Sequence, residues 1–283
     1  MKKAILFIII IGFLYSCQKS VHDIIGTSPV PPANCRLIKI IQGSRDSSSN
    51  NALYEDTIIH IKYDAQGRIA GIVDTIGIGS LTSKPTYDAA GRLLSIRQEE
   101  TPFNPIYFQY SSNGLLSAII DSSYFSTNRY TFEYAANNLP VKRTEYNIPT
   151  AQGSTDTSYK NYFYDPAGNI IRTIEYGPDS TLAGIVTEYT YTENANILAD
   201  LTPYRSGALY GFFDIMDFDS RFNKKMVSSY RQYQKAFQGS ILITNTYMHD
   251  SVGRITRIVT TQTQIPSLLP VETHTRFLFY ECK

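Results

Sequence analysis

The sequence predicts an all-β protein built of tandem antiparallel β-hairpins that form a large closed or nearly closed up-and-down barrel. Three observations predict it. A short turn motif recurs along the chain, residues flanking the motif alternate between apolar and polar, and Cys35 and Cys282 stand at the two ends of the folded part. Because successive side chains of a strand point to opposite faces, this alternation indicates a sheet with one buried face.

The first sixteen residues have the pattern of a signal peptide. Lys2 and Lys3 precede an apolar run over residues 4–14, which is shorter than the ~20 apolar residues that a membrane-spanning helix needs. With Ser16 before Cys17, residues 1–17 resemble the signal and lipobox of bacterial lipoproteins. In that class the cysteine becomes the N-terminus and receives a diacylglycerol and an acyl chain such as palmitate, so the resemblance implies lipidation of Cys17. Plain secretion, with an incidental Cys17, is the alternative.

Residues 17–34 are polar and contain Pro29, Pro31 and Pro32, which favours an extended flexible tether. Residues 35–283 remain for the folded part. A stretch of that length lies within the range that all-β barrels occupy as single domains, so we expect one domain.

The turn motif is clearest at residues 63–69 (YDAQGRI) and 87–93 (YDAAGRL). Asp at the first turn position accepts backbone N–H bonds, and Gly at the closing position adopts positive φ freely. The residues expected to form these turns are Asp64, Gly67, Asp88, Gly91, Gly114, Asp165, Gly168, Asp250 and Gly253. Further copies begin at Tyr110, Tyr134, Tyr164, Tyr191 and His249, and a degenerate copy is suspected at Phe218.

Two copies depart from glycine at the closing position. Asn138 in the fourth copy is an understandable substitute, because Asn tolerates positive φ, whereas Ala195 weakens the sixth turn. The long interval between Tyr191 and His249 leaves room for two units. Eight units in all would supply about sixteen strands, enough to enclose a wide lumen.

Cys35 and Cys282 are the two cysteines that remain once Cys17 is lipidated. A disulfide needs Cα atoms within about 7 Å of each other, so these cysteines pair only if the first strand, near residues 37–41, lies beside the last, near residues 276–280. Such a bridge would close the sheet and stabilise it by a few kcal/mol in an oxidising compartment. Two free thiols are the alternative.

The repeat resembles the YD repeats of the RHS family, whose hairpins wind into a shell around a toxin. Together with the lipobox, the chain more closely resembles a family of exported bacterial lipoproteins of unknown function that carry such repeats. This resemblance implies a porin-like β-barrel anchored to the outer membrane, and it implies no catalytic residue. The third, fourth and sixth copies lack the Asp of the motif.

Residues 203–218 (PYRSGALYGFFDIMDF) are apolar, aromatic and out of register with the hairpins. Two interpretations stay open. The segment either plugs the mouth of the barrel as a short helix or loop, or it forms a longer hairpin packed on the outside.

Charge and motifs narrow the function. A net charge of +1 without a Lys/Arg block argues against nucleic acid as a partner. The four histidines are His22, His60, His249 and His274; none has metalloprotease spacing, and we expect His249 to be a half-buried sheet residue. We predict no cofactor. Asp214, Asp217 and Asp219 lack the glycine and terminal glutamate of a calcium loop, which favours a solvated loop over a metal site.

These observations favour a monomeric, lipid-anchored cell-envelope protein, facing either the periplasm or the outside. We expect a non-catalytic binding or scaffolding module for a glycan or a protein. A hydrolase with an unrecognised site is one alternative, and an outer-membrane pore is a weaker one. A lipid-facing wall needs a clean apolar band, whereas residues 160–164 (KNYFY) carry polar side chains on both faces.

Overall fold

A computed structural model describes residues 35–46, 54–76, 79–99, 104–122, 126–149, 154–178, 184–199, 222–234, 239–265 and 269–282. The predictions for the signal peptide, for Cys17 and for the tether fall on residues 1–34, which lie outside the described residues. Among the described residues, no helix has the length and apolar character that crossing a membrane requires.

Sixteen strands follow one another along the chain. They are β1 (Cys35–Asp46), β2 (Tyr54–Tyr63), β3 (Ile69–Ile76), β4 (Gly79–Tyr87), β5 (Leu93–Gln98), β6 (Ile106–Tyr110), β7 (Leu116–Ser122), β8 (Ser126–Tyr134), β9 (Pro140–Pro149), β10 (Asp156–Tyr164), β11 (Ile170–Tyr176), β12 (Ile185–Ala195), β13 (Lys225–Gln234), β14 (Ser240–His249), β15 (Ile255–Ile265) and β16 (Leu269–Cys282).

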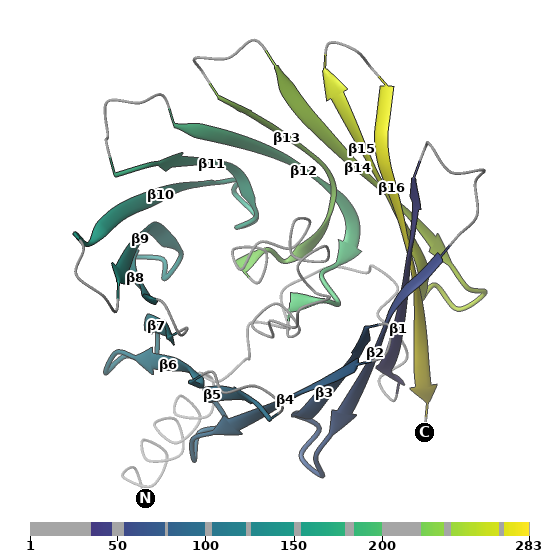
Figure 1. The fold of residues 1–283 in the computed structure, drawn as a ribbon, viewed down its shortest axis with the longest axis horizontal. Helices are drawn as coiled ribbons and strands as arrows, with labels where there is room; N and C mark the ends of the chain where they lie inside the picture. Colours follow the sequence, from purple (N-terminus) through teal and green to yellow (C-terminus); the bar gives the residue numbers. More distant parts are fainter. Residues whose placement is uncertain are drawn as a thin grey trace, which may run out of the picture.

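The strands form one closed antiparallel barrel in which each strand pairs with its neighbours in sequence (Figure 1). Strands β1 and β16 close the ring, in a register that runs from the pair Cys35 and Cys282 to the pair Asp46 and Glu272. The predicted all-β, up-and-down barrel is therefore confirmed, and the barrel is closed rather than nearly closed.

The repeated motif forms the tight turns at one end of the barrel, which we call the turn end. In the first copy the Gly67 amide donates to the Asp64 carbonyl at 3.0 Å, and the Asp64 amide donates to the Arg68 carbonyl at 2.9 Å. The closing residue has positive φ in six copies, namely Gly67, Gly91, Gly114, Asn138, Gly168 and Gly253. Only a residue that tolerates this conformation completes the turn without strain.

The sixth copy does not make a tight turn. Strand β12 continues to Ala195, and Tyr191 pairs with Val227 rather than with a residue just after the motif. Alanine at the closing position cannot adopt positive φ as readily as glycine, and this copy does not join its two strands directly: Ala195 pairs with Lys225, the first residue of β13. The prediction of two units in this interval is wrong, because the described chain places only β13 and β14 between the sixth and seventh turns. The suspected copy at Phe218 lies outside the described residues.

The turn end of the barrel interior is filled by an apolar core. Its members come from the inner faces of strands around the ring: Leu37, Ile40, Ile59, Ile61, Ile69, Ile72, Ile96, Phe108, Leu116, Ile119, Phe132, Ile255, Ile258 and Leu278. Leu198 and Met226, which flank the excursion between β12 and β13, are buried in the same core. Phe222 packs edge-on against Phe132, with ring centroids 6.1 Å apart. Residues 203–218 lie outside the described chain, but the residues on both sides of them fill the barrel from within.

A ring of tyrosines binds each hairpin to the one before it. The Tyr63 hydroxyl donates to the Leu37 carbonyl at 2.9 Å, and the Tyr87 hydroxyl donates to the Ile69 carbonyl at 2.8 Å. The same bond recurs at Tyr110, Tyr134, Tyr164, Tyr191, Tyr247 and Tyr280. In each case the acceptor lies near the start of the strand that follows the preceding connection. Eight hydrogen bonds thus run around the whole turn end.

We predict that Tyr87→Phe lowers the free energy of unfolding by about 1 kcal/mol, because it removes one hydroxyl bond and leaves the Ile69 carbonyl without that donor. Urea unfolding followed by circular dichroism measures the change. Tyr107→Phe, at an exposed outer position, is the matched control and should change the stability by less than about 0.5 kcal/mol. Equal effects at the two positions would show that the ring of hydroxyl bonds does not stabilise the barrel.

A second prediction concerns the closing residues of the turns. A Cβ at Gly91 would have no heavy atom within 4 Å, so Gly91→Ala tests the backbone alone, and its φ of 79° should cost about 1 kcal/mol of stability. Asn138→Gly, at a φ of 63°, should be neutral or slightly stabilising. The same unfolding assay compares the two. If Gly91→Ala left the stability unchanged, it would contradict the conclusion that the closing residue must tolerate positive φ.

Candidate functional site

Beyond the apolar core, the inner wall of the barrel becomes polar. The register places these residues on the same face as the core, further from the turn end; we call them the polar wall. They are Gln42, Asp74, Asp121, Asn128, Arg143, Glu145, Lys160, Glu175, Asn245, Thr260 and Arg276. The barrel interior therefore has an apolar core at the turn end and polar groups beyond it, together with a second, smaller apolar cluster of Val227, Tyr230 and Ile243.

Two cations lie side by side on the polar wall. Lys160 of β10 and Arg143 of β9 are direct cross-strand partners, with 7% and 8% of their surfaces exposed. Like charges in that position repel each other, and burial adds a cost of desolvation. Both groups are compensated in part: the Lys160 ammonium lies 3.1 Å from the Glu175 carboxylate of β11, and the Arg143 guanidinium lies 5.4 Å from the centroid of the Tyr130 ring. The polar wall thus holds two neighbouring positive charges that are largely buried from solvent.

A third cation, Arg276 of β16, is held within a hydrogen-bonded network. Its Nε donates to Gln42 at 3.0 Å and its Nη1 donates to Thr260 at 3.2 Å. The Thr260 hydroxyl in turn donates to Asn245 at 2.7 Å. Burial lowers the pKa of the Arg276 guanidinium to about 10, while Tyr247 and Tyr230 act in the opposite direction. Since that pKa is still well above 7, Arg276 keeps its charge at neutral pH.

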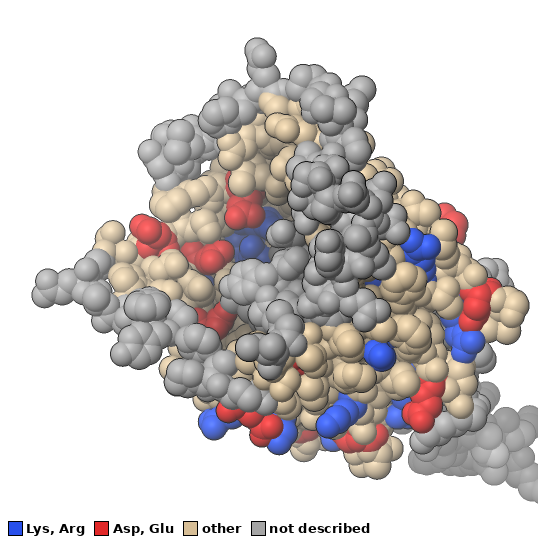
Figure 2. Space-filling view, turned by 45° about the vertical axis from the view of Figure 1, so that its right-hand side comes forward, with Lys and Arg blue, Asp and Glu red and all other residues tan. Residues whose placement is uncertain are grey.

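The space-filling view shows charged side chains on one face of the molecule. In Figure 2 several Asp and Glu side chains border a hollow in the face shown, and Lys or Arg side chains lie deeper within it. Inward cations surrounded by acidic and amide groups suit a polar ligand that presents both negative charge and hydroxyl groups.

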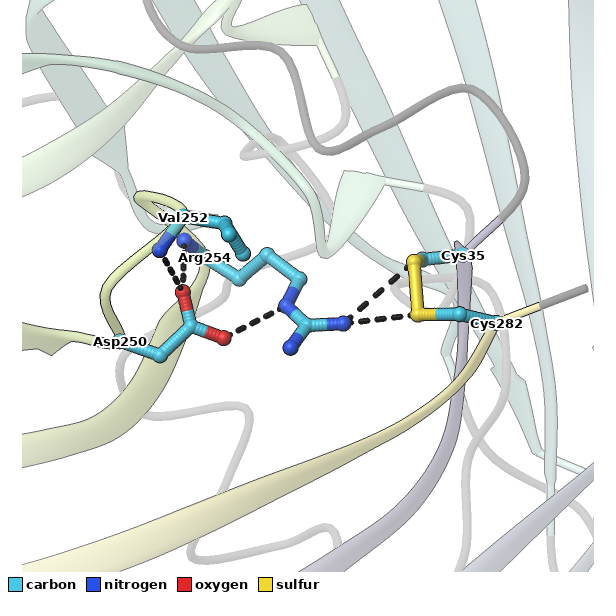
Figure 3. Close-up of a disulfide and its surroundings, with 5 residues drawn as sticks. All are labelled: Cys35, Asp250, Val252, Arg254 and Cys282. Atoms are coloured by element: carbon cyan, nitrogen blue, oxygen red, sulfur yellow. Dashed lines mark hydrogen bonds and ion pairs between the residues drawn. A yellow bond between two sulfur atoms is a disulfide. The ribbon is translucent and has the colours of Figure 1, made fainter.

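Cys35 and Cys282 are joined by a disulfide at the turn end, with Cα atoms 4.0 Å apart. Arg254 lies against it, since its Nη1 is 2.7 Å from the Cys282 sulfur and 3.4 Å from the Cys35 sulfur (Figure 3). The Arg254 Nε also donates to Asp250 at 2.6 Å. The guanidinium therefore connects the seventh turn to the covalent closure of the barrel.

This disulfide occupies the place of an eighth turn. Tyr280 pairs with Leu37 as Tyr63 pairs with Ile69 in the first hairpin. Cys35-Arg36-Leu37 thus stands where Gly-Arg-Ile stands in a complete copy, and Tyr280-Glu281-Cys282 stands for its first half. The motif is split between the first and the last strand of the barrel, and sulfur rather than backbone joins the halves.

The turn-forming aspartates lie at the turn end, away from the polar wall. Desolvation acts to raise the pKa of Asp64, but bonds from the backbone and side chain of Arg68 lower that pKa overall. At Asp88, the bond from the Arg92 backbone lowers the pKa, and desolvation opposes it. The ionised carboxylates therefore stabilise their own turns.

The histidines are dispersed. His60 lies exposed on β2, and His274 lies on β16. His249 is exposed and not half-buried as predicted, and its Nε2 lies 3.3 Å from the Asn194 side chain. In the ring of tyrosine bonds its place is taken by Tyr247, two residues earlier, whose hydroxyl donates to the Val227 carbonyl. No group of His, Cys, Asp and Glu suited to a metal ion occurs within the described parts of the chain, and Asp214, Asp217 and Asp219 lie outside them.

Sequence reasoning missed the residue that docks the returning segment. Asn169 is buried, and its side-chain oxygen accepts bonds from the Lys224 and Lys225 amides, each at 3.2 Å. In exchange, the Asn223 side chain accepts a bond from the Ile170 amide at 2.8 Å. The signal was an Asn in the fifth copy, at the position where three other copies have Arg. The polar wall was missed as well, because its members come from separate strands.

No protein-family model matches this chain, and no curated protein matches it. Solved structures do. A porin-like protein from Bacteroides uniformis aligns with a TM-score of 0.55 at 15% identity, covering 87% of this chain and 98% of that one. A porin-like protein from Bacteroides vulgatus aligns with a TM-score of 0.54 at 12% identity, over 87% and 98% of the two chains. At these identities the likeness concerns the fold, and by fold this chain is a porin-like β-barrel.

Proposed function

We propose that this protein is a lipid-anchored cell-envelope barrel that binds an acidic glycan at its polar wall without catalysing a reaction. The observation that carries the proposal is the division of the interior. The core fills the turn end, and buried Arg143, Lys160 and Arg276 lie on the inner wall beyond it. Cations recognise carboxylates, and the amide, hydroxyl and tyrosine groups around them suit sugar hydroxyls and sugar faces.

The outer wall supports a barrel that stands in water rather than one embedded in lipid. Charged side chains point outward and are exposed on several strands: Lys62, Lys84, Arg97, Glu133, Glu188 and Arg231. A charged side chain on the lipid-facing wall of a barrel costs about 2–4 kcal/mol at the membrane midplane for Arg or Lys. This distribution favours binding over a pore.

The anchor proposal rests on Cys17. Mass spectrometry of the N-terminal peptide from the membrane fraction should show a diacylglyceryl and an acyl group on Cys17, and Cys17→Ala should abolish both. A mature protein that begins elsewhere, without lipid, would contradict the anchor and leave the glycan proposal to its own test.

Calorimetric titration of the purified protein with carboxylate-bearing and neutral oligosaccharides tests the ligand class. We expect binding of the acidic series and a loss of about tenfold in affinity for Lys160→Gln or Arg143→Gln, since a charge-assisted hydrogen bond contributes about 1.5–3 kcal/mol. Lys62→Gln, on the exposed outer wall, should bind normally. Thermal melts establish that each variant is folded. Equal affinity for acidic and neutral sugars, a protein ligand in their place, or release of shortened sugars would each contradict the proposal.

The disulfide gives a separate prediction about the closure of the barrel. Cys35→Ser should lower the melting temperature under non-reducing conditions, because a closed loop of this length stabilises by about 3 kcal/mol or more. In reducing buffer the variant and the parent protein should melt together, and Cys282→Ser should behave as Cys35→Ser does. Equal losses with and without reductant would mean that the cysteines contribute through packing alone.

A further inference from the structure

The exposed apolar side chains of the barrel gather at the turn end. Of the nine large hydrophobic residues that are exposed in the described chain, seven lie in the turns or within a few residues of them; we call these seven the apolar belt. They are Leu94, Val141, Phe163, Ile171, Met248, Val252 and Phe279. Each is between 38% and 52% exposed. The other two are Tyr107 and Ile148, and Ile148 lies at the opposite end of β9.

The motif itself pushes part of this belt outward. After each turn the register shifts by one residue, so that Tyr87 pairs with Leu93 while Thr86 pairs with Ser95. Leu94 is left over and stands on the outside. The same shift leaves Val141 and Ile171 outside in the fourth and fifth hairpins. The β-bulges therefore place apolar groups on the rim of the turn end.

Each of the three belt residues that precede a turn has a cation as its cross-strand partner. The pairs are Phe163 with Arg172, Met248 with Arg257, and Phe279 with Lys39. The cationic groups of Arg172 and Lys39 lie 4.9 Å and 5.5 Å from the centroids of their partners' rings. A cation beside an apolar group suits the boundary of a bilayer, where phosphates lie directly outside the acyl chains.

The chain enters the barrel at this same end. Cys35, the first residue of β1, is bonded to Cys282 beside the seventh turn. The segment from Cys17 to Asn34, which leads to Cys35, would span at most about 60 Å when fully extended. A lipid on Cys17 would therefore tether the barrel through its turn end. Because strands of 10 to 12 residues are shorter than this tether, the belt and not the tether determines which end faces the membrane.

We propose that the turn end is a membrane-docking surface, whose apolar belt enters the outer layer of a phospholipid bilayer while the polar wall faces away. This inference rests on the proposed lipid anchor and adds an orientation to it. Docking by a belt explains why apolar side chains collect around the one end where the chain enters, and why cations stand directly beside them.

The chain contains no Trp, so a single introduced Trp reports its own depth. The test uses the lipidated full chain in vesicles of phosphatidylethanolamine and phosphatidylglycerol that contain phosphatidylcholine brominated on the acyl chains. Phe279→Trp and Phe163→Trp probe the belt. Ile148→Trp, at a similarly exposed position at the far end, is the matched control. We expect bromolipid to quench the belt tryptophans at least about threefold more than the control, because acyl-chain bromines reach only side chains that enter the bilayer.

Equal and weak quenching at all three positions would overturn the docking surface, and so would stronger quenching at residue 148. Vesicle flotation of the same samples separates the two proposals. Protein that floats without differential quenching keeps the anchor and loses the docking surface, whereas protein that does not float contradicts both. Burial of the belt tryptophans in vesicle-free solution at the same protein concentration, shown by protection from iodide, would assign the belt to a second copy of the chain instead.

Discussion

The bond from each tyrosine hydroxyl to the carbonyl of the preceding hairpin is the constraint on which the rest of this barrel depends. It fixes the distance between successive turns. Each tyrosine stands at the end of the strand that leads into one turn, and its hydroxyl reaches the carbonyl of a residue near the preceding turn. The Arg68 guanidinium lies 4.6 Å from the centroid of the Tyr87 ring, so the arginine of one turn also covers the tyrosine of the next. Each hairpin is thus positioned by the one before it, and the ring closes when the eighth bond meets the first.

The ring of tyrosines also determines where the interior of the barrel is apolar. Tyrosines aimed inward at one level bring apolar rings together there, and the first residues after the turns add Leu37, Ile69 and Leu116 to the same layer. The interior of the barrel at the turn end is consequently apolar. Strands of this length continue past the core, so their remaining inward positions face an interior that hydrophobic side chains need not fill. Polar groups such as Lys160 and Arg276 occupy those positions.

The motif was enough to predict the class of fold, and the two cysteines pointed to the neighbourhood of the first and last strands. The expected number of about sixteen strands is right, although the eighth unit is the split copy at the disulfide and not a second unit between Tyr191 and His249. These features depend on local turn chemistry and on a period of two, both of which are visible in a single sequence. The exchange of bonds between Asn169 and the returning segment was not visible, because its partners lie 55 and 56 residues apart and no local rule connects them. The pair Arg143 and Lys160 was also missed, since only the register between β9 and β10 shows that the two cations are neighbours.

The split copy of the motif makes the folded chain a covalent ring with a tail. Once sulfur has joined Cys35 to Cys282, the backbone between them has no free end, and the seam is chemically distinct from the other connections but equivalent to them in its place around the ring. Six of the connections at the turn end are tight turns of one kind, so none of these six marks a preferred starting strand. A circular permutation that opens the chain at a different tight turn, and joins the present ends with an Asp-x-x-Gly linker, would preserve every strand neighbour. The position of the termini therefore determines where the tail leaves the ring and does not determine which strands pair.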